Sequence, residues 1–139
     1  MKHTILLLAV VALTASVRAG GEHDHGHSHN HITIPATLPE VRAEIAAQQQ
    51  KLAESLAAKD AKAAHAATDV LSALVKAIPG KTASLDDTTL QRLQGMASNA
   101  AKAWGDAAHA AEHGDYERAA RESAKAGAAY RLMESRLGT

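Results

Sequence analysis

Apolar side chains recur at alternating intervals of three and four residues from about residue 41 onward, and this period constrains the fold more than any other feature. Phe is absent, aromatic residues make up only 2% of the chain, and alanine fills many of the periodic positions. Alanine has the highest helix propensity, and it is poor material for sheets. The sequence therefore predicts an all-α protein.

Start and stop signals divide the periodic region into four helices. Thr37 to Glu40 has the pattern of a capping box with a proline in the first turn, which predicts a first helix from about Pro39 to Ala58. The later signals are, in chain order, Asp60 as a cap, Pro79 and Gly80 as a stop, Ser84 as a cap, Gly114 as a stop and Asp115 as a cap.

Four amphipathic helices joined by short links pack most simply as an antiparallel up-down-up-down four-helix bundle, here over residues 37–139. A dimer of helical hairpins has the same spacing, so a monomer and a homodimer both stay open. The expected core is Val41, Ile45, Leu52, Leu56, Ala64, Ala67, Leu71, Leu74, Ile78, Leu90, Leu93, Ala97, Ala100, Trp104, Ala107, Ala111, Tyr116, Ala119, Ser123, Ala126, Tyr130, Met133 and Leu137.

Residues 1–19 have the composition of a secretory signal peptide. A basic start is followed by the apolar run Ile5 to Leu13 and by small residues before a cleavage point after Ala19. The run is shorter than the roughly 20 residues that a membrane-spanning helix needs. We therefore expect a periplasmic or secreted protein with no membrane attachment after cleavage.

Residues 20–36 show no apolar period and are rich in polar residues and glycine, which predicts a disordered arm. The arm contains the stretch GEHDHGHSHNH, in which every second residue from 23 to 31 is histidine. In an extended chain, side chains two residues apart lie on the same side, so neighbouring imidazoles can close on one ion. The expected metal ligands are His23, His25, His27, His29 and His31, with Asp24 adding a carboxylate.

The expected ligand of this arm is a divalent transition-metal ion. Neutral imidazole is the commonest nitrogen ligand for zinc, copper and nickel, and the absence of cysteine leaves only nitrogen and oxygen donors. The pattern does not select among zinc, copper, nickel and cobalt.

Two further histidines form a second candidate. His109 and His113 are four residues apart, which places both on one face of the third helix, where they can clamp a metal ion or stand as solvated side chains near a helix C-terminus. With Trp104 facing the core, both should point outward. His65 lies near the start of the second helix, and the expected helix lengths place it two or more turns from this pair.

Several classes of function have no support in the sequence. The chain has 15 basic and 15 acidic residues and no clustered basic surface, so no nucleic-acid binding is expected. No Ser-His-Asp order or phosphate-binding glycine loop is present, so we expect no enzyme activity. The letters from His109 to His113 match an inverted zinc-protease signature, but only 26 residues follow them, too few for a further ligand and a substrate cleft.

The stretch from Asp106 to Ala120, followed by Ala128 to Arg131, resembles the last two helices of the soluble periplasmic b-type cytochrome. That resemblance implies a four-helix bundle. In that family a methionine early in the first helix and a histidine near the end of the fourth hold the haem iron. Here the first helix has no methionine and Arg131 stands at the place of the histidine, so no haem is expected.

In composition and architecture the chain also resembles the small His-rich exported proteins that accompany bacterial heavy-metal efflux and resistance systems. This resemblance implies a periplasmic protein that binds, buffers or delivers metal and that meets an efflux or uptake component. The alternative is a helical adaptor or sensor domain that binds a protein partner through the bundle. The turn from Glu112 to Tyr116, which resembles the turn within a tetratricopeptide repeat, fits that alternative.

Overall fold

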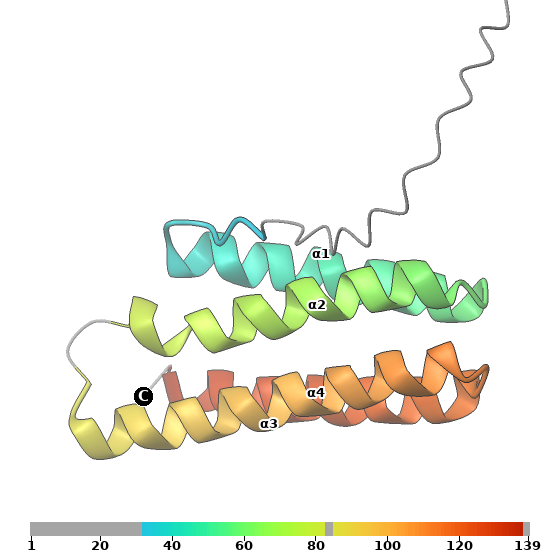
Figure 1. The fold of residues 1–139 in the computed structure, drawn as a ribbon. Coiled ribbons are helices and arrows are strands. Elements are labelled where there is room, and N and C mark those ends of the chain that lie inside the picture. The colour runs from blue at the N-terminus through green and yellow to red at the C-terminus, as the bar shows by residue number, and fades with distance from the viewer. Residues whose placement is uncertain (1–31, 83–84, 138–139) are drawn as a thin grey trace, which may run out of the picture. The chain divides into compact units, whose positions relative to one another are not determined.

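The computed structural model describes residues 32–82 and 85–137, and within them it contains four α-helices and one short 3-10 helix (Figure 1). Successive α-helices run in opposite directions, so the predicted antiparallel up-down four-helix bundle is confirmed. Residues 1–31 lie outside the described residues, and with them the predicted signal peptide and the histidines of the arm. The elements are α1 (Leu38–Ala57), α2 (Ala61–Ala77), η1 (Pro79–Lys81), α3 (Asp87–Glu112) and α4 (Tyr116–Leu137).

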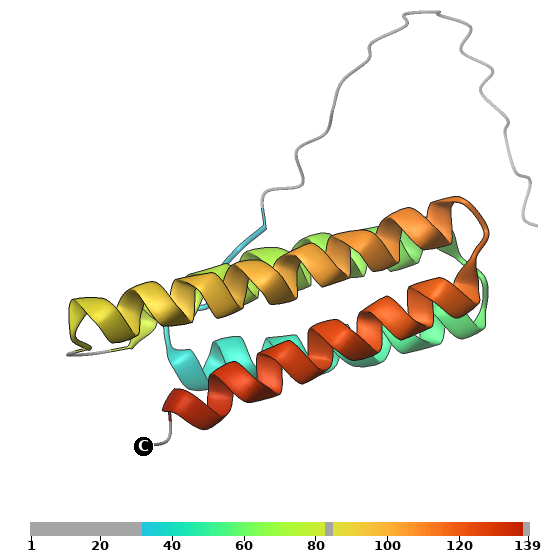
Figure 2. The ribbon, with the colours of Figure 1, turned by 90° about the horizontal axis from the view of Figure 1, so that it is seen from below.

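The helices do not contact one another equally. Figure 2 shows α3 lying over α2 and α4 lying over α1. Contacts of α3 with α2 and with α4 are extensive, and α1 packs well on α2, whereas α1 and α4 make few close backbone contacts. The α1–α4 side of the bundle is therefore the most open.

The first two helices begin at the predicted caps. The backbone N–H of Thr37 donates to Glu40 Oε2 at 3.0 Å, and the N–H of Glu40 donates back to Thr37 Oγ1 at 3.4 Å, which completes the capping box. The bond from the Thr37 N–H, and then that from its hydroxyl, holds the pKa of Glu40 below its usual value. At the second helix, Asp60 accepts the N–H of Ala63 at 2.9 Å.

The third helix begins two residues later than the sequence predicts. Its cap is Asp86, which accepts the backbone N–H of Thr89 at 2.9 Å and its hydroxyl at 2.6 Å, and not Ser84, which lies outside the described residues. These two bonds, the hydroxyl bond first, lower the pKa of Asp86. The fourth helix has its predicted cap, because Asp115 accepts the N–H of Arg118 at 2.9 Å.

The predicted core is mostly confirmed. Every expected core residue of α1 and α2 is buried, and so is every one in α3 except Leu90, which is half-buried. In α4 the four residues Tyr116, Ser123, Tyr130 and Leu137 are only half-buried. These four residues are less buried because α4 makes few close contacts with α1.

The last five residues assigned to the arm, 32–36, lie against the bundle. Ile34 packs on the hydrophobic core, and Lys81 Nζ donates to the carbonyl of Ala36 at 3.0 Å. The bundle therefore begins before its first helix. None of the helices in 32–82 and 85–137 is long and apolar enough to cross a membrane.

Candidate metal centre

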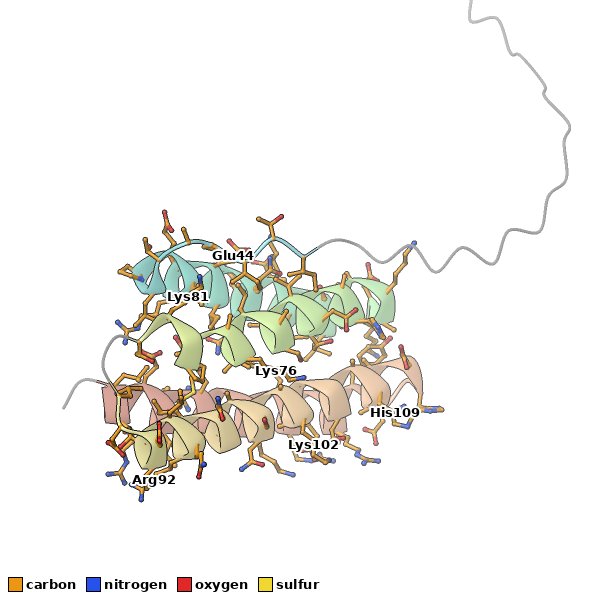
Figure 3. The ribbon with its side chains drawn as sticks, turned by 60° about the vertical axis from the view of Figure 1, so that its left-hand side comes forward. Glu44, Lys76, Lys81, Arg92, Lys102 and His109 are labelled. Carbon is orange, nitrogen blue, oxygen red and sulfur yellow. The ribbon has the colours of Figure 1, made fainter. Side chains whose placement is uncertain are left out.

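The candidate site that the structure describes lies at the end of α3, beside the α3–α4 turn. Both His109 and His113 are exposed there, as predicted, because Trp104 and the alanines on the opposite face of the helix fill the core. Figure 3 shows His109 projecting away from the helices at this end of the bundle. The ligands predicted in the arm, the histidines from His23 to His31 and Asp24, lie outside the described residues.

Helical spacing brings the two imidazoles together. Their ring centroids are 4.5 Å apart and the ring planes are nearly perpendicular, at 79°. His113 is the C-terminal cap of α3, and its N–H still donates to the carbonyl of His109 at 3.3 Å. The four-residue spacing of a helix is therefore kept through the second histidine.

His65 is held by two carboxylates. Its Nδ1 lies 2.5 Å from Glu112 Oε1, on the neighbouring helix, and its Nε2 lies 3.3 Å from Asp69 Oδ2, one turn along α2. The Nδ1 contact is a hydrogen bond, whereas the Nε2 contact is an ion-pair distance only. Both ring nitrogens of His65 therefore face carboxylate oxygens, one on the neighbouring helix and one on its own.

The expected separation of His65 from the other two histidines is wrong. Ser72 Oγ donates to the carbonyl of Ala101 at 3.3 Å, and this contact sets the register of α2 against α3. Because α2 and α3 run antiparallel, a step back along α2 matches a step forward along α3. His65 lies seven residues before Ser72, so it is level with Ala108, which lies seven residues after Ala101 and next to His109.

The surroundings of the pair are partly acidic. Asp106 lies one turn before His109, and a hydrogen bond of 2.7 Å from Lys102 lowers the pKa of its carboxyl group, with His109 adding a smaller electrostatic effect in the same direction. Glu112 lies between the histidines in sequence but is turned toward His65. Among residues 32–82 and 85–137, no group of three or more His, Cys, Asp or Glu side chains is arranged to hold a metal ion.

A polar cluster that the sequence analysis missed joins α1 to α4 where their contact is sparse. Arg42 Nε lies 2.6 Å from Glu134 Oε2, and the Tyr130 ring lies beside Trp104 with 6.4 Å between centroids. Burial, and then the nearby Glu134 charge, raises the pKa of Tyr130 to about 12. The opposite charges of Arg42 and Glu134 could have suggested an ion pair between α1 and α4. The spacing of apolar residues within each helix does not show how the two helices are aligned, so the pair was not predicted.

A second surface feature is an apolar groove between α1 and α4. Its volume is about 440 Å³, and it lies where α1 and α4 make few close backbone contacts. Small side chains form most of its walls, since the lining residues are Ala53, Leu56, Ala57, Tyr116, Ala120, Ser123 and Ala124.

Comparison with known proteins gives no relative for this chain: no protein-family model, no curated protein and no solved structure matches it. The likeness to the b-type cytochrome and to His-rich exported proteins therefore stays a prediction from the sequence.

Proposed function

We propose that this protein binds divalent transition-metal ions through its His-rich N-terminal segment, and that it buffers or delivers them in the periplasm as part of metal homeostasis or resistance. The observation that carries the proposal is the alternation of five histidines within the nine residues 23–31. Together with the carboxylate of Asp24, this is the densest set of metal-binding groups in the chain.

The chemistry of such a segment suits exchange. Zinc, copper and nickel all accept neutral imidazole, and a chain that must order itself around the ion loses conformational entropy, which lowers the affinity. A site of moderate affinity can release its ion to an efflux or uptake component. The signal-like composition of residues 1–19 supports a location outside the cytoplasm for this activity.

The bundle is the second part of the proposal. Its hydrophobic core is closed by residues from all four helices, with Trp104 only 1% exposed, so the fold needs no metal ion to complete it. We infer that the bundle serves as a stable carrier for the metal-binding segment.

An alternative function, binding of a protein partner through the bundle, is favoured by one observation, the apolar groove between α1 and α4. A partner that used this groove would bind without metal and without residues 20–31. Capture of a partner that succeeds equally without residues 20–31 and without metal would favour this alternative.

The test is calorimetric titration with Zn²⁺, Cu²⁺ and Ni²⁺ of the chain from Gly20, the form expected after cleavage, and of the same chain with its five arm histidines changed to glutamine. We expect the glutamine variant to lose most of the bound metal while its helical circular dichroism is unchanged, because all five histidines precede the first described helix, which begins at Leu38. Full stoichiometry in the variant would refute the proposal and assign the metal to the histidines of the bundle.

A further inference from the structure

We propose that His109 and His113 form a separate metal site on the bundle, in which two imidazoles hold one divalent transition-metal ion and water fills its remaining positions. This site does not depend on the arm. It follows from which of the three described histidines are available, how the available two are spaced, and which charges surround them.

Availability separates the three histidines. Both ring nitrogens of His65 face carboxylate oxygens, so this ring is already engaged. In the part of the chain that the structure describes, the rings of His109 and His113 make no hydrogen bond and no ion pair, and their closest ring contact is with each other. Because both are exposed, an ion can reach their nitrogens without displacing core residues.

The spacing suits one ion. An imidazole nitrogen lies about 2.0–2.1 Å from a bound zinc ion, so two neighbouring ligands on one ion have ring centres about 4.5 to 5.2 Å apart. The observed 4.5 Å between the centroids of His109 and His113 lies at the short end of this range, which corresponds to ligands at a right angle. The rings need to rotate so that one nitrogen of each faces the ion, and no core packing opposes that rotation.

The local charges also favour a cation. The last turn of an α-helix carries the negative end of the helix dipole, and His113 caps that turn. Asp106, one turn before His109, adds a carboxylate, although Lys102 offsets part of its charge. With two protein ligands, the expected site is open and exchangeable, and copper(II) should bind most tightly because it leads the Irving–Williams order.

The test uses the chain from Gly20 in which the five arm histidines are glutamine, so that a failure of this site and a failure of the arm proposal are distinguishable. Cu²⁺ is the probe, and calorimetry with electron paramagnetic resonance is the measurement. We expect one equivalent of Cu²⁺ with two nitrogen ligands. His109→Gln or His113→Gln alone should remove it, because one exposed imidazole gives no chelate.

A matched control keeps the number of histidines on α3 and changes only their spacing. Gly105 is exposed and has no atom within 4 Å of an added Cβ, so the double variant G105H/H109Q should fold. Its two histidines would be eight residues apart, about 12 Å along the helix, too far to share an ion. Retention of the Cu²⁺ equivalent in this variant, in either single variant, or its absence from the starting protein would overturn the proposal.

Discussion

At the scale of single residues, the α1–α2 turn and the α3–α4 turn share one backbone conformation. They carry different residues at the position with a positive φ. Both helices end in a Schellman motif, in which the residue after the cap has a positive φ. That residue is Lys59 after α1, with φ 56°, and Gly114 after α3, with φ 76°. The motif's hydrogen bonds are Lys59 N–H to Leu56 O, Asp60 N–H to Ser55 O, Gly114 N–H to Ala111 O and Asp115 N–H to Ala110 O.

This pair of turns predicts opposite effects of opposite substitutions. A side chain in the left-handed region costs about 1 kcal/mol, so Lys59→Gly should raise the free energy of unfolding by roughly 0.5–1 kcal/mol and Gly114→Ala should lower it by about 1 kcal/mol. Urea denaturation measures both. Lys59→Ala removes the side-chain charge and keeps the strain, so it should stay near the parent; a destabilised Lys59→Gly protein would contradict the prediction.

The residue scale also shows why the candidate site could be predicted only in part. The four-residue spacing of His109 and His113 is enough to place both rings on one exposed face. The capture of His65 by Glu112 and Asp69 depends on how α2 and α3 are aligned, which no single-helix pattern contains. The residue contacts between helices are therefore what could not be predicted from the pattern within each helix.

At the scale of elements, the helix starts carry a pH dependence. The pKa values of Glu40 and Asp86 are lowered from 4.5 and 3.8, because backbone N–H groups and threonine hydroxyls donate to their carboxylates. A carboxylate with a lowered pKa in the folded state stabilises the protein above its unfolded pKa, and this contribution is lost as the pH falls through the folded value. Acid should therefore weaken the starts of α1 and α3.

The variant E40Q/D86N tests this effect, because amide side chains remove the charges and keep an oxygen that accepts the capping backbone N–H. At position 86 the second bond, which the Thr89 hydroxyl donates to Asp86 Oδ2, is not kept, because the amide NH2 group cannot accept it. We expect the variant to be less stable than the parent at pH 7 and the two melting temperatures to converge as the pH falls below the unfolded values of 4.5 and 3.8. Thermal unfolding followed by circular dichroism at several pH values measures the difference. A gap that stays constant down to the lowest pH would show that the charges contribute nothing to the caps.

The elements themselves were the most predictable part of the fold. Strong local signals, such as the capping box at Thr37 and the glycine at position 114, gave helix ends within one residue of those observed. The start of α3 was predicted less well, because Ser84 and Asp86 are both good caps and only the bonds to Thr89 show which one is used. Competing local signals are resolved by three-dimensional contacts.

At the scale of the whole molecule, the packing is asymmetric. The helix α3 lies between α2 and α4 and contributes Trp104, the largest fully buried side chain, whereas α1 has one extensive partner, α2. Separation of α1 therefore breaks one broad contact, and separation of α3 breaks two. Local opening should need less free energy at α1 than at α3.

Native-state hydrogen exchange at low denaturant concentration tests this ranking. We expect amides in the middle of α3, around Ala100 and Trp104, to exchange only through global unfolding, and those in the middle of α1, around Ile45, to exchange faster through partial opening. The substitution Ala53→Leu adds a larger apolar side chain at the α1–α4 groove. It should slow exchange in α1 more than in α3, and so reduce the difference in exchange rate between the two helices. Equal exchange in α1 and α3 would mean that the bundle opens as one unit despite its uneven contacts.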